Sequence, residues 1–287
     1  MTVTVSANAK INLYLDVVGR RENGYHEIVS VMQSLSLADT LTATRVQGGA
    51  LSLDTEGVLP ADDTNLVVRA AKAYFAAAKT PFGVQLHLHK VIPMAAGMGG
   101  GSADAAATLK ALNMLDEGRF SLAELAAIGA GVGADVPFLV YGGTALCRGI
   151  GERITPLQNR LTASVVVAVD GEGVSTPAAF GALDARYRQF ADFQTEYTPT
   201  PLINALEKGD FSATVSALFN RFESVIEPQR PAVSALKQEL LRYGADAVQM
   251  SGSGPTVFGI FADDAAAQRV TCYLKNCGVR AYHCKML

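Results

Sequence analysis

The sequence predicts an α+β protein of about two domains. Its 287 residues are enough for two domains of ordinary size. Segments with the period-two alternation of a strand are interspersed with segments that carry the apolar stripe of a helix. Hydrophobic residues make up 49% of the chain and charged residues 18%, so a sizeable core is expected. We place the domain boundary just before an apolar run that begins at Ser164, which gives predicted domains of residues 1–158 and 159–287.

The composition and the sequence also indicate which kinds of partner this protein is not expected to bind. The formal net charge is −3, without the basic excess of a nucleic-acid-binding protein. No apolar run is long enough to cross a bilayer, and the N-terminus lacks the charged and apolar regions of a signal peptide. The cysteines contain no C-x-x-C pair, which predicts free thiols in a reducing cytosol rather than a zinc site; they are Cys147, Cys272, Cys277 and Cys284. We therefore expect a cytoplasmic protein that binds neither nucleic acid nor membrane, with its oligomeric state open.

The first predicted strand spans residues 3–17, where apolar residues alternate with polar ones. Alternate side chains lie on opposite faces of a strand, so Lys10 and Asn12 project from the same face. A solvated strand face is the ordinary explanation for a single lysine. The turn-rich segment that follows ends in Tyr25 and His26, which offer an aromatic stacking surface and two hydrogen-bonding nitrogens. Packing within the turn would explain these two residues equally well.

Three elements are predicted between this strand and the next motif. Residues 35–46 have strand character, and residues 66–78 have a helical pattern preceded by polar N-cap candidates. Residues 85–90 alternate as a strand, with His87 and His89 on one face. A metal site at this pair would need further ligands, and none is clustered nearby in the sequence. Two partly exposed histidines are therefore the favoured interpretation.

A glycine-rich loop leads from the 85–90 strand into an alanine-rich helix. The loop and the helix start comprise Pro93, Met94, Ala95, Ala96, Gly97, Met98, Gly99, Gly100, Gly101, Ser102 and Ala103. Glycine has no Cβ, so consecutive backbone N–H groups can turn toward one anion, and the following helix adds its positive dipole end. The lysine of a P-loop is absent, and a dinucleotide-binding G-x-G-x-x-G motif fails because residue 102 is serine. The loop suits a nucleotide phosphate, with Ser102 as a phosphate or Mg²⁺ ligand; a glycine turn with Ser102 as helix N-cap is the alternative.

One acid stands out after this loop. A helix is predicted over residues 103–115, and a capping-box pattern at Ser121 opens the next helix, which ends near Gly131. Asp135 then stands alone as an acid in an apolar, glycine-flanked run. One interpretation makes it the N-cap of a short helix with Pro137 in the first turn. The other interpretation places its carboxylate in a site.

The second half of the chain alternates predicted strands and helices. Glycines within residues 142–151 mark a turn-rich connection. The strand run from Ser164 is followed by helical patterns at residues 201–222 and 231–243, then by a strand, a second glycine-serine loop and a strand over residues 249–261. A further helix and a short C-terminal strand complete the α+β pattern.

Three of these motifs occur in the order found in the GHMP family of small-molecule kinases. They are the N-terminal lysine strand, the P-x-x-x-G-x-G-G-G-S loop and a late loop with the sequence Ser251-Gly252-Ser253-Gly254-Pro255. Further segments resemble the branch of that family whose substrate is a methylerythritol unit linked to cytidine diphosphate. They are Ala9-Lys10-Ile11-Asn12-Leu13, Asn23-Gly24-Tyr25-His26, Gly133-Ala134-Asp135-Val136-Pro137-Phe138, and Val174-Ser175-Thr176-Pro177 leading to Phe180. The resemblance covers essentially the whole chain, and the combination is specific although the glycine loop alone is not.

The resemblance implies a two-domain GHMP kinase fold. Its N-terminal α+β domain would be similar to ribosomal protein S5 domain 2, its C-terminal domain would be ferredoxin-like, and the active site would lie between them. The implied reaction transfers the γ-phosphoryl group of ATP to the 2-hydroxyl of the methylerythritol unit, in the mevalonate-independent route to isoprenoids. Residues 93–103 would hold the ATP phosphates, and Ser102 would contact phosphate or Mg²⁺.

The resemblance also implies roles for individual side chains. Asp135 would accept or orient the proton of the acceptor hydroxyl, while Lys10 would keep that carboxyl ionised and stabilise developing negative charge. Asn12 would belong to the same cluster. The cytidine end would be bound, through stacking and hydrogen bonds, by Tyr25, His26 and Phe180.

Two other functions remain open. A related kinase acting on homoserine or mevalonate would share the phosphate loop, but such small acceptors give Tyr25, His26 and Phe180 no base to stack on. A dinucleotide-dependent oxidoreductase would use the glycine loop as a Rossmann turn, but that fold expects the loop after the first strand of a βαβ unit. Turnover with ATP and candidate acceptors, compared with NAD and a reductant, separates the three functions.

Overall fold

The computed structural model describes residues 1–79, 82–171, 173–187 and 198–287. Their packing divides the chain into two compact units. Unit 1 consists of Met1–Ala9, Ala38–Met94 and Gly99–Gly142, and unit 2 consists of Lys10–Leu37, Ala95–Met98 and Gly143–Leu287. The long strands β1 (Thr2–Arg20) and β2 (His26–Val46) therefore contribute one end to each unit. The predicted boundary after residue 158 stays a prediction.

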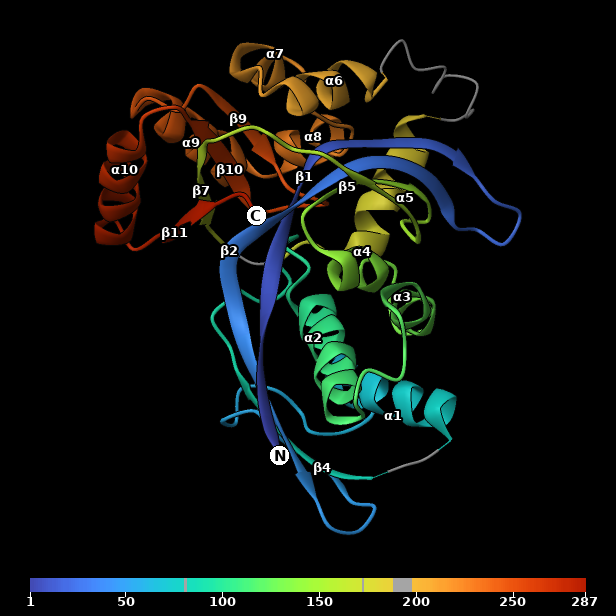
Figure 1. Cartoon of the computed structure of the whole chain (residues 1–287). Helices are drawn as coiled ribbons and strands as arrows, with labels where there is room; N and C mark the ends of the chain where they lie inside the picture. The colour runs from blue at the N-terminus through green and yellow to red at the C-terminus, as the bar shows by residue number, and fades with distance from the viewer. Residues whose placement is uncertain (80–81, 172, 188–197) are drawn as a thin grey trace. The chain divides into compact units, whose positions relative to one another are not determined.

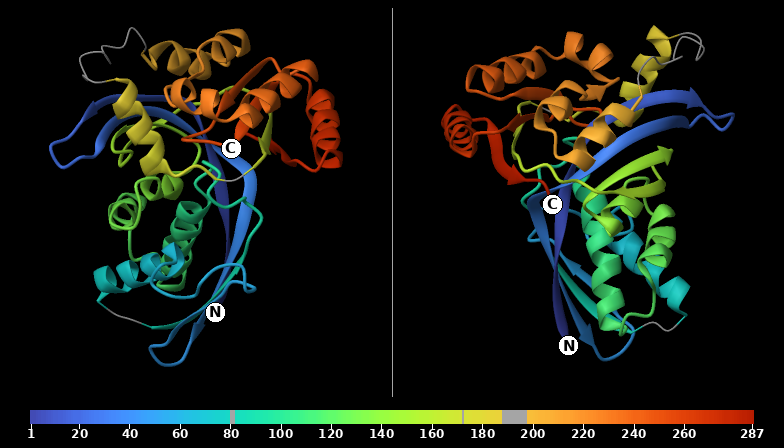
Figure 2. Two further views of the ribbon diagram at one scale, coloured as in Figure 1. Left: turned by 180° about the vertical axis from the view of Figure 1, so that it is seen from behind. Right: turned by 45° about the horizontal axis from the view of Figure 1, so that its top comes forward.

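Unit 1 packs helices beside strands. The C-terminal end of β2 pairs antiparallel with β4 (Gly83–His89), which in turn pairs parallel with β3 (Leu51–Asp54). Both views of Figure 2 show the helices of this unit on one side of these strands. These helices are α1 (Leu66–Ala78), α2 (Gly100–Leu115), α3 (Leu122–Ala130) and α4 (Val136–Tyr141). Helix α2 packs against both α1 and α4, and its many alanines allow that close approach.

Two helices of unit 1 begin where their capping residues predict. Asn65 caps α1 by accepting the backbone N–H of Val67 through its side chain. At α3, Ser121 accepts the N–H of Glu124, and the Glu124 carboxylate accepts the N–H of Ser121. This reciprocal pair is the predicted capping box. Both helix starts are therefore determined by signals within a few residues of sequence.

Unit 2 contains an antiparallel sheet with the strand order β11-β7-β10-β9. Its strands are β7 (Ser164–Val169), β9 (Ala247–Met250), β10 (Val257–Phe261) and β11 (Arg280–Lys285). Helices α9 (Pro231–Arg242) and α10 (Asp264–Asn276) pack on this sheet (Figure 1). In chain order these elements run β7-α9-β9-β10-α10-β11, and the last strand lies beside the first. This is the ferredoxin-like pattern that the resemblance implied.

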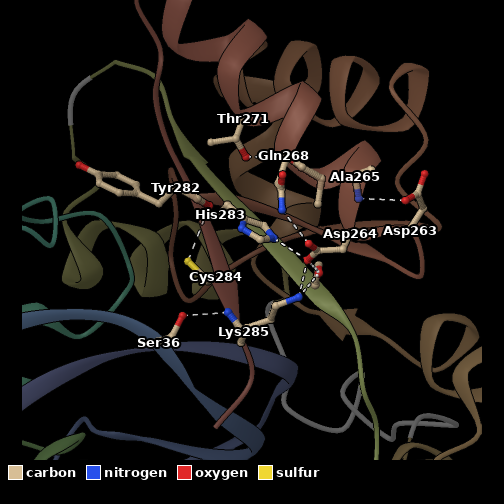
Figure 3. Close-up of polar contacts among 12 residues, drawn as sticks. Ser36, Asp263, Asp264, Ala265, Gln268, Thr271, Tyr282, His283, Cys284 and Lys285 are labelled. Carbon is tan, nitrogen blue, oxygen red and sulfur yellow. Dashed lines mark hydrogen bonds and ion pairs between the residues drawn. The ribbon is translucent and has the colours of Figure 1, made fainter.

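A polar cluster ties α10 to two strands of that sheet (Figure 3). Asp264, in the first turn of α10, accepts hydrogen bonds from Ser164 of β7 and from Lys285 of β11, and its Oδ1 lies 2.9 Å from Nε2 of His283. Lys285 also donates to the hydroxyl of Ser164 at 2.7 Å. The hydrogen bond from Lys285 is the main reason that the pKa of Asp264 lies well below its usual range. The cluster therefore fastens the edge strand β11 to the helix that covers it.

The other elements of unit 2 connect this sheet to the long strands. They are β5 (Thr144–Gly149), β6 (Arg153–Leu157), α5 (Thr176–Arg186), α6 (Thr200–Lys208), α7 (Phe211–Ser216), β8 (Phe219–Asn220), α8 (Glu223–Ile226) and a 3₁₀ turn, Glu227–Gln229. Strand β5 pairs with β2 and with β6, and β8 pairs parallel with β1. Among the described residues, no helix is both long enough and apolar enough to cross a membrane.

Two predictions for unit 2 were wrong in detail. The helical pattern at residues 201–222 is interrupted, because Gly209 adopts a φ of 70° that ends α6, and Asp210 then caps a separate helix α7. The turn-rich segment at residues 142–151 contains the buried strand β5 between its glycines. Those glycines mark the ends of a strand rather than one long loop.

Candidate active site

The glycine-rich loop ends at helix α2, which begins at Gly100, three residues before its predicted start. Gly99 is the N-cap, with a φ of 69° in the left-handed region and no side chain to cap the helix. The N–H groups in the first turn of an α-helix have no intrahelical acceptor, so Gly100, Gly101 and Ser102 present donors at the positive end of the dipole. The interpretation of Ser102 as N-cap was therefore wrong, because Ser102 lies inside the first turn. This helix start has the properties of a phosphate-binding site.

Within unit 2, residues 95–98 of the loop pack against the second glycine-serine loop. The Ser251 hydroxyl donates to the carbonyl of Gly97 at 3.1 Å, and the Thr256 hydroxyl donates to the carbonyl of Ala96. Gly97 has a φ of 77°, and a Cβ at this position would lie 2.4 Å from the carbonyl oxygen of Ser251. Only glycine fits this contact. Two loops that are far apart in the sequence therefore hold each other.

We expect Gly97→Ala to weaken ATP binding and to lower the free energy of unfolding by about 1–3 kcal/mol, because strain and a backbone clash add together. Gly143→Ala is the matched control, since Gly143 also has a positive φ of 67°, but a Cβ added there would meet nothing within 4 Å. Isothermal titration with ATP and thermal unfolding check both variants. Equal ATP affinities in the two variants would contradict the importance of this loop contact.

Asp135 occupies the N-cap position of α4, with Pro137 in the first turn of that helix. Its side chain makes no capping hydrogen bond to the helix. The turn before it lies close to α2, since a Cβ at Gly133 would be 3.6 Å from Oγ of Ser102. Within unit 1 the structure therefore brings the Asp135 segment beside the start of α2. Helix capping alone does not account for this acid.

A buried charge cluster supports the start of α2, and the sequence did not point to it. Lys90 donates to Asp39 and to Oδ2 of Asp104, the latter at 2.7 Å. The side chains of Lys90, Asp39 and Asp104 are 7%, 0% and 2% exposed. Asp39 also accepts the backbone N–H of Ile92 at 2.8 Å. Because Lys90 and Ile92 precede the glycine-rich loop and Asp104 lies in α2, one lysine fixes the chain on both sides of the loop.

This cluster makes stability depend on pH. Burial, followed by the charge of Asp39, raises the pKa of Asp104 to about 7, although Lys90 opposes the shift. The folded protein therefore keeps a proton that the unfolded chain releases between pH about 4 and pH about 7. We expect the free energy of unfolding to decrease as pH rises through this window, and we expect Asp104→Asn to flatten the decrease. Denaturant unfolding of both proteins across the window checks this, and parallel curves would contradict it.

Lys10 and Asn12 lie on the same face of β1, as predicted, but that face is covered. Lys10 is 4% exposed and Asn12 is 1% exposed, so the explanation that this strand face is exposed to solvent was wrong. Nζ of Lys10 donates to Oδ1 of Asn12 at 2.9 Å, and Nδ2 of Asn12 donates to Oγ of Ser30 at 2.9 Å. The backbone N–H of Lys10 donates to the carbonyl of Met98 at 3.0 Å. Lys10 is therefore held by the glycine-rich loop through its backbone and by Asn12 through its side chain.

The structure also brings His26 and Phe180 together within unit 2. Their rings stack, with centroids 4.4 Å apart and an interplanar angle of 15°. Phe222 contacts Phe180 edge-on, and Nε2 of His26 lies 2.7 Å from Oδ1 of Asp184. Tyr25 is 59% exposed. A base held between Tyr25 and Phe180 stays a prediction.

The histidine pair on β4 is paired with acids rather than assembled into a metal site. His87 lies 3.1 Å from Asp54, and His89 lies 3.1 Å from Glu56. Nowhere in the described part of the chain do three His, Cys, Asp or Glu side chains form a group that could hold a metal ion. With nucleotides, a magnesium ion ordinarily takes its ligands mainly from phosphate oxygens and water. A single hydroxyl such as that of Ser102 fits this donor set.

Comparison with known proteins identifies the family. Residues 65–143 match the model of the GHMP kinases N terminal domain, and residues 202–280 match that of the GHMP kinases C terminal domain. A 4-diphosphocytidyl-2-C-methyl-D-erythritol kinase of Exiguobacterium sibiricum is 41% identical over 271 residues, which cover 94% of this chain and 93% of the relative.

Solved structures agree with the sequence relatives. A crystal structure of 4-(cytidine 5'-diphospho)-2C-methyl-D-erythritol kinase matches with a TM-score of 0.84 and 34% identity, covering 99% of each chain. Homoserine kinase from Cytophaga hutchinsonii matches with a TM-score of 0.74 at 19% identity over 98% of this chain and 93% of that one, which shows the shared fold alone. The predicted α+β GHMP kinase fold is confirmed, and the chain is a small-molecule kinase. The chain belongs to the GHMP kinase family, and its full-length relatives place it in the branch that contains the 4-diphosphocytidyl-2-C-methyl-D-erythritol kinases.

Proposed function

We propose that this kinase transfers the γ-phosphoryl group of ATP to the 2-hydroxyl of 4-diphosphocytidyl-2-C-methyl-D-erythritol, giving the 2-phosphate and ADP in the mevalonate-independent route to isoprenoids. Membership of the GHMP family already implies ATP as co-substrate. The observation that carries the choice of acceptor is the full-length similarity to kinases named for this substrate, and the aromatic rings of His26 and Phe180 lie together where a base could stack. The cysteines form no disulfide in the described part of the chain, and we place the reaction in the cytoplasm.

The phosphate end of the reaction depends on positioning and charge. In our proposal the first turn of α2 and the loop of residues 93–103 hold the ATP phosphates. The acceptor oxygen bonds to the γ-phosphorus, the bond to the ADP oxygen breaks, and the hydroxyl proton passes to Asp135. Lys10, held by Asn12, stabilises the negative charge that develops on the transferred group. When bound, Mg²⁺ neutralises phosphate charge, and Ser102 is its protein ligand.

The cytidine end is bound by Tyr25, His26 and Phe180. The exposed ring of Tyr25 is available to cover one face of the base, and Phe180 offers a second aromatic surface. Stacking accepts any base, so the choice of cytosine has to come from hydrogen bonds to the base edge. His26 supplies a polar ring next to Phe180 for that purpose.

Lys10→Met tests the proposed charge stabilisation. We expect kcat to fall by about 10²–10³-fold with a smaller change in KM for ATP, because a charge aimed at the transferred group acts mainly in the transition state. Lys72→Met is the matched control, since that lysine lies on α1 with its side chain 57% exposed. Steady-state kinetics of both variants measure kcat and the KM for ATP, and so show whether Lys10 acts in the transition state. A rise in KM alone would make Lys10 a ground-state phosphate ligand.

Turnover with competing acceptors tests the function itself. The purified protein is incubated with ATP and one acceptor at a time. The acceptors are 4-diphosphocytidyl-2-C-methyl-D-erythritol, homoserine and mevalonate, and phosphorus NMR identifies the product. We expect a new monophosphate ester with the cytidine substrate only. Faster turnover with homoserine or mevalonate would replace this proposal by a kinase of that type. In a parallel incubation with NAD and a reductant, turnover of NAD without phosphoryl transfer would replace the proposal by an oxidoreductase.

A further inference from the structure

A chain of hydrogen bonds connects Lys10 to the backbone of the sheet through two buried side chains of unit 2. Nζ of Lys10 donates to Oδ1 of Asn12 at 2.9 Å, and Nδ2 of Asn12 donates to Oγ of Ser30 at 2.9 Å. Oγ of Ser30 donates in turn to the backbone carbonyl of Tyr14 at 2.7 Å. Ser30 lies in β2, next to β1, and is 0% exposed. The chain therefore ends on a fixed backbone group of β1.

The hydroxyl of Ser30 decides which end of the Asn12 amide faces Lys10. A serine hydroxyl has one proton, and Ser30 gives that proton to the Tyr14 carbonyl, which can only accept. Toward Asn12, Oγ of Ser30 is then an acceptor, so the amino end of the amide points to Ser30 and the carbonyl end points to Lys10. An ammonium group only donates, so the carbonyl end is the one that can hold it. Every bond in the chain runs in the same direction, and such bonds strengthen one another.

The backbone of Asn12 is held from a different strand. Nε2 of Gln249, in β9, donates to the carbonyl of Asn12 at 3.1 Å and to that of Leu13 at 3.3 Å. Gln249 is buried. The position of the Asn12 backbone therefore does not depend on Ser30. The contact with Ser30 fixes the rotation of the Asn12 side chain.

The carbonyl end of the oriented amide lies at the two glycine-containing loops. A Cβ added at Gly252, in the second glycine-serine loop, would lie 3.7 Å from Oδ1 of Asn12 and 3.2 Å from the carbonyl oxygen of Gly97. The backbone N–H of Lys10 donates to the carbonyl of Met98 in the first loop. The amide therefore presents its carbonyl end toward the loops and its amino end toward the interior of the sheet.

We propose that Ser30 is a positioning residue for phosphoryl transfer, because its hydroxyl orients the Asn12 amide that holds the Lys10 ammonium group. The inference rests on the proposed function, in which Lys10 stabilises the negative charge that develops on the transferred group. Such stabilisation is most effective when the charge is already held in place before the reaction. In this role Ser30 acts through Asn12 and contacts neither substrate.

A merely structural role for Ser30 predicts a different result. If the hydroxyl only satisfied the Tyr14 carbonyl, its loss would lower the free energy of unfolding and would change turnover equally whether or not Asn12 is present. The positioning role predicts a loss of kcat that occurs only while Asn12 is present. A double-mutant cycle between Ser30 and Asn12 separates the two roles, because it measures whether two changes act independently.

The test compares Ser30→Ala, Asn12→Ala and the double variant in the full-length protein. Ser34→Ala is the matched control. Ser34 also lies in β2 and is 2% exposed, but its hydroxyl has no hydrogen-bond partner among the residues that the structure describes. Ser30→Cys is a second variant that fills the space of the serine, although a thiol is only a weak donor and acceptor. Steady-state kinetics with ATP and the cytidine substrate give kcat and both KM values, and urea unfolding gives the stability of each variant.

We expect kcat to fall by about tenfold in Ser30→Ala, since one buried hydrogen bond is worth about that much. Ser30→Cys should also lower kcat, while Ser34→Ala should keep the wild-type value. The KM for ATP should change little, because the oriented charge acts mainly in the transition state. Asn12→Ala should lower kcat further than Ser30→Ala does, and adding Ser30→Ala to it should cause no additional loss.

Each other outcome counts against a specific claim. Wild-type kcat in Ser30→Ala or in Asn12→Ala overturns the positioning role and leaves the kinase function intact. A loss of the same size when Ser30→Ala is added to Asn12→Ala overturns it as well, and so does an equal loss in Ser34→Ala. If Ser30→Ala does not fold, the same cycle with Ser30→Cys decides. No turnover of the cytidine substrate by the wild-type protein overturns the proposed function, and the role of Ser30 falls with it.

Discussion

Replacing Asp135 with asparagine is expected to lower kcat by about 10²–10⁴-fold while ATP still binds, because the variant loses a positioned proton acceptor. Asparagine is as good an N-cap as aspartate, so the start of α4 is preserved. The change therefore removes charge and proton affinity but very little structure. Steady-state kinetics, together with isothermal titration of ATP, measure the two effects separately.

The matched control is Asp263→Asn. Asp263 is the N-cap of α10, and its side chain accepts the N–H of Ala265, so its carboxylate is engaged in capping. We expect this variant to keep wild-type turnover. Activity of Asp135→Asn within a few-fold of that control would mean that Asp135 acts only at the start of α4.

Lys90→Met is expected to cost about 3–5 kcal/mol of unfolding free energy, because breaking a buried ion pair leaves uncompensated charge inside the protein. Methionine matches the length of the lysine stem. The loss of unfolding free energy therefore measures the removal of the charge rather than a change in side-chain volume. Asp39 would be left without its cation, and Asp104, whose pKa burial already raises to about 7, would take up a proton instead. Urea unfolding at neutral pH measures the effect.

The double variant Lys90→Met with Asp104→Asn provides an internal check. Asp104→Asn should recover the part of the lost stability that comes from protonating Asp104 at neutral pH, because asparagine needs neither a proton nor a counter-ion. The exposed Lys72→Met change should cost little, as surface ion pairs usually do. A loss in Lys90→Met no greater than in Lys72→Met would show that the buried cluster does not hold the glycine-rich loop in place.

Features with local causes could be predicted from the sequence. Asn65 and Ser121 cap their helices through partners two or three residues away. Lys10 and Asn12 share a face because of strand periodicity alone. The glycine-rich loop was evident from its composition, although the residue that caps α2 proved to be Gly99 rather than Ser102.

Features that depend on distant partners could not be predicted. Asp184 meets His26 across 158 positions of sequence, and Lys90 meets Asp39 across 51 positions. No periodicity or motif links such pairs, because only the fold brings them together. The one signal for Asp184 was its place four residues after Phe180, and that signal was hidden because helix α5 itself was not predicted.

The way the chain is shared between the two units limits how such an enzyme can change by recombination. Unit 2 takes Lys10–Leu37 and Ala95–Met98 from the first half of the chain. A gene segment that encodes only residues 159–287 would lack the β1 partner of β8 and the two carbonyls that Ser251 and Thr256 bind. Residues 159–287 therefore do not contain all of the segments that make up unit 2. An exchange of residues 159–287 with a relative would therefore have to preserve the contacts of that segment with Lys10–Leu37 and Ala95–Met98.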